Sequence, residues 1–364
     1  MRRFFTGRTE TILPILALFL SAVGVLNTYS ATFYARGGGF PIYLKQVVWV
    51  GLGFFLALGI SWLNESLLED ISLPVYVITL LLLLLVLVAG KTTGGARRWI
   101  SLGPVSIQPS ELGKVAIILF LGRYFARSYN PYGITLRDLV VPFAFVLVPF
   151  FLIILQPDLG TGGLYILIFA GMAYLASLRT RSIATLFLAG LVSLPVVWNL
   201  MRDYQKKRVL TFLSPERDPF GAGYHVIQSK IAIGSGGLFG KGFLQGTQGQ
   251  LRFLPEQHTD FAFSVFAEEW GFFVCLVFLI LFLLFILRIF FLARQVQDRF
   301  SALVIGGIGV YFLLQFSINL AMVMGLFPVV GVPLPFVSYG GSSMLTSMLA
   351  VGVVMNQSKR RFLL

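Results

Sequence analysis

The chain has 364 residues, of which 57% are hydrophobic and only 12% are charged. Soluble domains carry about 25% charged residues, so this composition excludes a soluble globular protein. The net charge of +13 does not indicate nucleic acid as a partner, because basic residues of membrane proteins flank the spans and contact anionic headgroups. Cys275 is the only cysteine, which excludes an intrachain disulfide and a thiolate metal cluster.

Apolar segments recur along the whole chain, and we expect ten of them to cross the membrane as helices. The predicted spans are 12–29, 43–63, 73–90, 110–125, 139–155, 164–178, 183–201, 261–291, 302–326 and 338–355. No small-residue cleavage site follows the first apolar run, so we expect it to be retained as the first span. The sequence therefore predicts an all-α, polytopic transmembrane protein with a single domain over residues 1–364.

The distribution of lysine and arginine in the short loops sets the orientation of the spans. More of these residues lie on the side that holds both termini, which predicts that both termini are cytoplasmic. The acidic segment 64–72 is placed on the same side, because acidic residues count little in this rule. Residues 202–260 then form a large outer loop between the seventh and eighth spans.

The outer loop combines basic residues and glycines with scattered aromatic and aliphatic side chains. A loop of this length in a compact chain is either disordered or functional, and its composition is not of low complexity. The spacing of Tyr224, Ile227 and Ile231 predicts a short amphipathic helix that lies against the membrane surface.

Charged residues within or beside membrane spans are costly and persist mainly at functional sites. Glu111 and Lys114 are three residues apart at the start of the fourth span and share one helix face. They form an internal ion pair, or Lys114 acts on a substrate. Asp158 lies in the short turn between the fifth and sixth spans, where it either caps the next helix or takes a direct part in catalysis.

Asp260 ends the outer loop where the chain re-enters the membrane, and this position makes it the foremost candidate for function. We expect the nearby His258 to form a hydrogen bond with Asp260 rather than to bind a metal. Glu268 and Glu269 are adjacent in the following span. They cannot both point the same way, so at least one of them is expected to be structural.

A series of motifs follows in order along the chain. Those within the outer loop are 208–213, 215, 218–219, 223–224, 228–229, 232–237, 240–242, 246–248, 253–256 and 258–261, and those outside it are 98–100, 108–112, 156–161, 325–328 and 333–342. Across residues 12–357 the chain resembles the SEDS family (shape, elongation, division and sporulation), and within that family the RodA-like elongation members. One departure is His225, where the family pattern has glutamine.

The resemblance implies a peptidoglycan glycosyltransferase of the bacterial inner membrane that polymerises lipid II into β-1,4-linked glycan strands during cell elongation. It also identifies Asp260 as the essential acidic residue. An inverting displacement of undecaprenyl diphosphate needs a base for the acceptor hydroxyl, here Asp260, and cations for the leaving diphosphate. The candidates for binding the diphosphate or supporting the site are Lys114, Glu111, Asp158, Arg208, Arg98, Lys241 and His258.

The predicted chemistry does not by itself require a cofactor. A divalent cation near Asp158 or Asp260 would share with the basic residues the stabilisation of the leaving diphosphate. The resemblance further implies a class B penicillin-binding protein, a transpeptidase, as partner, with an exposed face of the eighth and ninth spans as the contact surface. Membrane lipids are expected to surround the spans.

Two other functions fit a polytopic protein with a lipid substrate. A lipid II flippase is the main alternative, and a scaffold that only recruits a transpeptidase is another. A transporter concentrates polar groups near the midplane, whereas here Asp158 and Asp260 fall at the outer face. The distribution of charge therefore favours the enzyme.

Overall fold

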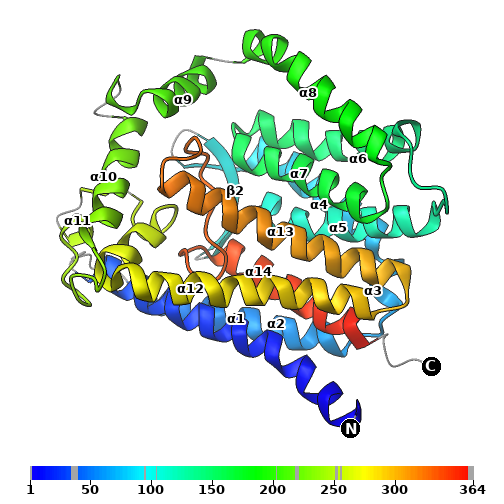
Figure 1. Ribbon diagram of the computed structural model, residues 1–364, viewed down its shortest axis with the longest axis horizontal. Coiled ribbons are helices and arrows are strands. Elements are labelled where there is room, and N and C mark those ends of the chain that lie inside the picture. Colours follow the sequence, from blue (N-terminus) through cyan, green and yellow to red (C-terminus); the bar gives the residue numbers. More distant parts are fainter. Residues whose placement is uncertain are drawn as a thin grey trace.

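The computed structural model describes residues 2–33, 40–93, 96–103, 105–201, 203–217, 221–250, 253–254 and 256–359. The long helices run side by side in one bundle, and the start of the first helix lies at the same end of the bundle as the end of the last (Figure 1). An even number of spans requires this arrangement of the termini.

Each predicted span coincides with a helix. These helices are α1 (Arg2–Thr32), α2 (Ile42–Trp62), α4 (Ser72–Ala89), α5 (Pro109–Arg127), α6 (Leu136–Leu155), α7 (Leu159–Leu175), α8 (Thr180–Leu200), α12 (Ala262–Gln295), α13 (Arg299–Val323) and α14 (Gly341–Ser358). By length and composition alone, six of them can cross a membrane, namely α1, α2, α4, α6, α12 and α13. Most residues of α5 and α14 are buried inside the bundle, so these two helices tolerate polar residues that a lipid-facing helix would not.

Side chains at the helix starts explain several of the boundaries. Thr135 and Asp138 form a capping box at the start of α6. The Asp298 carboxylate accepts a hydrogen bond from the Ser301 backbone N–H (2.9 Å) and caps α13. Pro109 occupies the first turn of α5, where its missing N–H is not needed.

The prediction of helices alone missed a small antiparallel sheet between α4 and α5. Its strands are β1 (Lys91–Thr93), β2 (Ala96–Leu102) and β3 (Val105–Ile107), in the order β1-β2-β3. A short helix, α3 (Leu67–Asp70), precedes α4.

The outer loop is largely helical. It contains α9 (Asp203–Leu213), a 3-10 turn (Pro215–Arg217), α10 (Ala222–Ser235) and α11 (Thr247–Gln250). In Figure 1, α8, α9 and α10 follow one another as an arch along the edge of the bundle.

Helix α10 corresponds to the amphipathic helix expected in the outer loop, since it contains Tyr224, Ile227 and Ile231. Its Ser229 hydroxyl contacts the Ser264 hydroxyl of α12 (2.7 Å) and donates to the Val323 carbonyl of α13 (2.6 Å). Ile231 points elsewhere and is 45% exposed. The face of α10 that packs on the bundle therefore holds Val226, Ser229 and Ala232, all buried, while its contact with the membrane surface stays a prediction.

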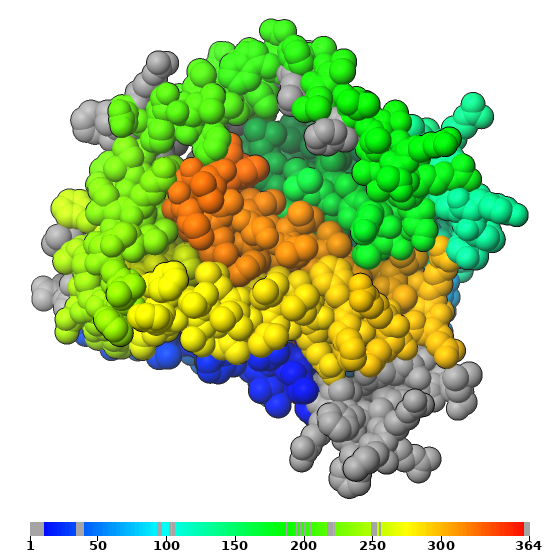
Figure 2. All heavy atoms as spheres, in the orientation of Figure 1, coloured from blue at the N-terminus to red at the C-terminus, as the bar shows by residue number. Residues whose placement is uncertain are grey.

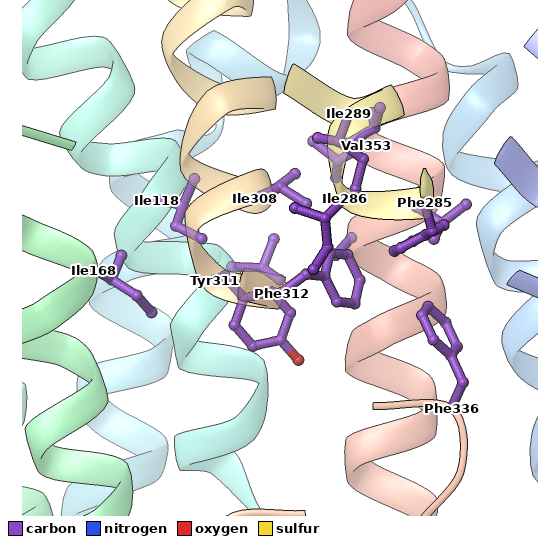
Figure 3. Close-up of a cluster of buried hydrophobic side chains, with 14 of the residues drawn as sticks. Ile118, Ile168, Phe285, Ile286, Ile289, Ile308, Tyr311, Phe312, Phe336 and Val353 are labelled. Carbon is purple, nitrogen blue, oxygen red and sulfur yellow. The ribbon is translucent and has the colours of Figure 1, made fainter. Parts of the chain in front are cut away.

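Helix α13 lies at the centre of the bundle and packs against α5, α7, α12 and α14. Its Ile308, Tyr311 and Phe312 belong to the buried cluster in Figure 3, where Phe285 of α12 and Phe336 of the α13–α14 connector meet them. The Phe312 and Phe336 rings are stacked with centroids 5.4 Å apart. This packing fixes the connector against the bundle core.

Helices α2 and α14 make the closest helix pair of the bundle. A Cβ atom at Gly352 of α14 would lie 2.7 Å from the Cα and from the carbonyl oxygen of Ala57 in α2. A side chain at Gly352 would therefore have to push the two backbones apart.

We expect Gly352→Val to destabilise the protein by about 1–3 kcal/mol, because the added atoms overpack a backbone contact. The measurement is the melting temperature in detergent. Gly59→Val is the matched control, since a Cβ at Gly59 of α2 meets no atom within 4 Å. Equal melting temperatures for the two variants would contradict the packing argument.

Candidate active site

A cavity of about 750 Å³ lies at the end of the bundle where α2, α5, α7 and α14 begin. Its charged and histidine lining comes from six separate segments of the chain: Lys45, Lys91, Arg98, Glu111, Asp158, Glu256, His258 and Asp260. Trp49, Trp99, Phe40 and Tyr339 add aromatic surface. Charge and aromatic surface in one cavity of this size suit a ligand with anionic and apolar or sugar parts.

The small sheet directs Arg98 into the cavity. Lys91 of β1 pairs with Trp99 and Thr92 pairs with Arg97, so β2 has one extra residue, Arg98, between the two pairs. Such a bulge re-aims a side chain. The Arg98 guanidinium donates to the carbonyls of Gln156 (3.2 Å) and Pro157, and its side chain keeps 27% exposure. A cation is thereby held in place with part of its surface open to the cavity.

Asp158 is the N-cap of α7. Its carboxylate accepts hydrogen bonds from the Thr161 backbone N–H (3.1 Å) and hydroxyl (3.0 Å), and from Gln108 Nε2 (3.3 Å). Arg98 Nη1 lies 3.8 Å from Asp158 Oδ2. The capping interpretation is confirmed. With its oxygens engaged in this way, Asp158 orients Arg98.

Asp260 is held by the connector between α13 and α14. The Asn319 amide of α13 donates to the Asp260 carbonyl (3.0 Å) and to the Val332 carbonyl (2.8 Å). The Ser338 hydroxyl donates to the Thr259 carbonyl (2.5 Å). Asparagine inside an otherwise apolar span thus joins two loops and fixes the backbone beneath the Asp260 carboxylate.

The Asp260 carboxyl group has an unusual affinity for protons. Its pKa is raised from 3.8 to about 6, chiefly by burial and then by the negative charges of Glu256 and Asp158, while Arg98 and Arg208 act in the opposite direction. Among the described residues, no cation lies within ion-pair distance of Asp260. A carboxylate in this state can accept a proton near neutral pH.

His258 also lines the cavity but does not serve Asp260 as expected. Its ring packs against the ring of Tyr339, with centroids 5.7 Å apart, and its carbonyl accepts a hydrogen bond from the Tyr339 N–H (2.8 Å). In the part of the chain that the structure describes, no hydrogen bond joins the His258 ring to Asp260, which corrects that prediction. Burial lowers the pKa of His258, so the ring is neutral at pH 7.

The Glu111–Lys114 pair predicted from the sequence is present. Lys114 Nζ lies 2.7 Å from Glu111 Oε1 and 3.1 Å from Gln315 Oε1, and the Lys114 side chain is wholly buried. Glu111 lines the cavity, whereas Lys114 is not among the lining residues. This geometry favours charge compensation inside the bundle over direct action of Lys114 on a substrate.

The remaining candidate cations lie apart from the cavity lining. Lys241 pairs with Glu268 at 2.6 Å. Arg208, on α9, is near enough to affect the charge state of Asp260. The structure thus brings together Arg98, Glu111, Asp158, His258 and Asp260 in the lining of one cavity. Lys114, Arg208 and Lys241 are outside that lining.

Sequence reasoning missed several residues of the site. Lys45, Lys91 and Glu256 line the cavity, and Gln315 and Asn319 support it. The signal for the last two was visible, because they are polar residues four positions apart in an apolar span and therefore share one helix face. Lys45 and Lys91 gave no signal, since isolated lysines beside spans usually only flank the membrane.

The divalent cation expected near Asp158 or Asp260 stays a prediction. In the residues that were described, no group of three or more histidine, cysteine, aspartate or glutamate side chains is arranged to hold a metal.

Comparison with known proteins gives consistent matches over nearly the whole chain. The FtsW/RodA/SpoVE family model, described as "Cell cycle protein", matches residues 10–362. The peptidoglycan glycosyltransferase MrdB of Escherichia coli K12 is 39% identical over 360 residues, covering 96% of this chain and 94% of that protein. The peptidoglycan glycosyltransferase RodA of Treponema pallidum is 32% identical, covering 97% and 98%.

Solved structures show the same similarity. A chain of a peptidoglycan synthase complex that coordinates polymerization and crosslinking is 34% identical, with a TM-score of 0.83 and coverage of 96% of this chain and 98% of that chain. The rod shape determining protein RodA of Thermus thermophilus is 30% identical, with a TM-score of 0.71 and 96% coverage of both chains.

We expect Lys114→Met to destabilise the protein by about 3–5 kcal/mol, because it leaves the Glu111 carboxylate buried without its cation. The double variant Glu111→Gln/Lys114→Met removes both charges and should recover much of that loss. The measurements are the melting temperature and the activity of both variants, which distinguish charge compensation from a direct role of Lys114. A double variant as stable as the wild type yet fully inactive would instead assign Lys114 a direct role in the reaction.

Proposed function

Since the chain belongs to the FtsW/RodA/SpoVE family, we propose that it is an elongation-type peptidoglycan glycosyltransferase that polymerises lipid II. The main observation in support is the Asp260 carboxyl group, whose pKa of about 6 suits a general base, in one cavity with the partly exposed guanidinium of Arg98. The relatives named peptidoglycan glycosyltransferases span nearly the whole chain, which supports the same reaction.

In the proposed reaction, the 4-hydroxyl oxygen of an acceptor sugar attacks the anomeric carbon of a donor that is α-linked to diphosphate. The new β-1,4 bond forms as the bond to the diphosphate oxygen breaks, with inversion. The hydroxyl proton passes to Asp260, and undecaprenyl diphosphate leaves as an anion. Because this leaving group needs no protonation, the mechanism requires one carboxylate base rather than the pair that glycosidases use.

Arg98 is the proposed contact for the departing diphosphate. Its guanidinium is fixed by two backbone carbonyls and by Asp158, so it meets the developing charge without reorganising. Lys45 and Lys91 line the same cavity and supply further positive charge. Asp158 and Glu111 are supporting residues in this scheme, and Lys114 acts through Glu111.

A divalent cation is part of the proposal, and Asp158 or Asp260 would hold it. Such an ion would neutralise charge on the leaving group. Carboxylate oxygens of Asp158, Asp260 and Glu256 line the cavity and are of the type that Mg²⁺ prefers, and the diphosphate would supply the other ligands.

The flippase alternative fits the cavity less well. Its charged lining lies at the end of the bundle where α2, α5, α7, α12 and α14 begin, and by the predicted orientation this is the outer end. A carrier that works by alternating access places its site near the midplane, where both sides can reach it in turn.

The proposed partner is a class B penicillin-binding protein, consistent with the similarity to a chain of a peptidoglycan synthase complex. We propose α12 as its contact surface. Helix α13 is largely enclosed, whereas α12, in yellow in Figure 2, is exposed on one face from Phe272 to Phe291. That face includes Phe272, Leu276, Ile280, Leu283 and Leu287.

We expect the purified protein in detergent, with lipid II and a class B partner but no nucleotide or ion gradient, to produce glycan chains visible on a gel. Asp260→Asn should abolish the product, because an amide cannot accept the acceptor proton. Glu69→Gln, which breaks an exposed ion pair with Arg127, is the matched control and should retain activity.

Near-normal polymer from Asp260→Asn would refute the base assignment. An inactive wild-type complex that still moves lipid II across sealed vesicles would establish transport instead.

The pH profile provides a second prediction. Asp260 must be ionised to act, and its pKa is raised from 3.8 to about 6, so kcat/KM should fall as the pH drops below about 6. A carboxyl of ordinary pKa would sustain activity to about pH 4. The midpoint of the pH profile should be unchanged in His258→Asn, because the loss of activity at acid pH reflects protonation of Asp260. An acid limb that disappears in this variant would show that the histidine controls it.

A further inference from the structure

Glu268 is a buried charge that the proposed mechanism does not use. Its side chain is fully enclosed, and its carboxylate accepts hydrogen bonds from Lys241 Nζ (2.6 Å) and from the Thr247 backbone N–H (2.8 Å) and hydroxyl (3.0 Å). The Gln248 backbone N–H adds another at 3.2 Å. All these donors come from one stretch of the outer loop, residues 236–248, which we call the loop anchor.

The loop anchor is inserted into a break in α12. At Gly271 the backbone leaves the helical conformation (φ 71°, ψ −175°). The Lys241 N–H donates to the Glu268 carbonyl (3.0 Å), and the Phe272 N–H donates to the Gly237 carbonyl (2.9 Å). Backbone groups that an unbroken helix would pair internally are therefore paired with the loop.

Two glycines permit this insertion. A Cβ at Gly240 would lie 2.1 Å from the Glu269 carbonyl oxygen, and a Cβ at Gly271 would lie 2.1 Å from the Gly240 nitrogen. Both residues also have positive φ. The two backbones are in direct contact, so a shift of the loop anchor must be transmitted to α12.

The break divides α12 into an outer part, 262–270, and the long membrane-spanning part. Asp260 lies two residues before the outer part begins at Ala262, and Glu268 lies near its other end, about 9 Å from Ala262 along the axis. Asn319 and the α13–α14 connector hold the Asp260 end. Glu269 ties the same short helix to α1 through the Ser30 hydroxyl.

We propose that Glu268 is a positioning residue for the transfer reaction: paired with Lys241, it holds the loop anchor in the break of α12 and thereby sets the direction of the outer part of α12 and of Asp260 at its start. The proposal rests on the proposed role of Asp260 as base. It assigns the glycine-rich end of the outer loop to the support of Asp260 rather than to contact with the diphosphate.

The test compares Glu268→Gln, Lys241→Met and Lys241→Arg with the wild type in the detergent assay, with Glu69→Gln as control. Glu268→Gln keeps the shape and removes the charge, and Lys241→Met removes the partner from a partly exposed position. We expect kcat to fall about tenfold or more in both, with little change in KM, because Asp260 is misdirected while the cavity is intact. Lys241→Arg retains the ion pair and should stay near the wild type.

Two further measurements separate positioning from simple stability. Glu256 and Asp158 raise the proton affinity of Asp260, and Arg98 and Arg208 lower it; burial is the largest influence. A loosened outer helix admits water, so the acid midpoint of the pH profile should move below that of the wild type in both weakened variants. Amide exchange should become faster across 236–248 and 262–270.

Wild-type kcat and pH midpoint in Glu268→Gln and Lys241→Met would overturn the proposal. A loss of activity that only matches the loss of folded protein, with an unchanged midpoint, would overturn it as well and leave Glu268 a purely structural residue. If Asp260→Asn is inactive in either of these cases, the proposed function stands without this inference. If Asp260→Asn is active, both fall together.

Discussion

The bundle depends on internal compensation of its buried charges, because lipid offers them no partner. Among the described residues, three ion pairs with a buried carboxylate meet this need, and each also fixes a segment of the chain: Arg98–Asp158, Lys114–Glu111 and Lys241–Glu268. The first joins the small sheet to the start of α7, the second joins α5 to α13 through Gln315, and the third holds the outer loop on α12. Asp260 stands apart from these pairs, and its raised pKa follows from burial without a close cation.

The sequence was sufficient for those features that depend on residues near one another in the chain. Apolar runs predicted the ten helices, since a span is a local property. Asp158 was recognisable as a cap, and Glu111 and Lys114 as an i,i+3 pair, for the same reason. The family resemblance identified Asp260, whose cavity and pKa agree with a role as base.

Features formed by distant segments could not be predicted. Lys241 was a candidate for the diphosphate because it is basic and lies among glycines, yet it pairs with Glu268, 27 residues further along the chain. The strands around Arg98 are as short as three residues and carry no usable period, so the bulge that aims Arg98 was invisible. Lys114 carried two interpretations, and only its complete burial beside Glu111 and Gln315 separates them.

The position of Asp260 also suits the repeated cycle of a polymerase. In the proposed reaction, each sugar transfer delivers one proton to Asp260, which must lose it before the next acceptor arrives. A carboxyl with a pKa of about 6 binds the proton during transfer and releases it at neutral pH, and its partial exposure at the mouth of the bundle gives that proton access to solvent. A fully buried base would retain the proton, while a fully exposed one would bind it too weakly. Partial burial of the Asp260 carboxyl requires that its backbone is held on both sides, by Asn319 from α13 and by the outer part of α12.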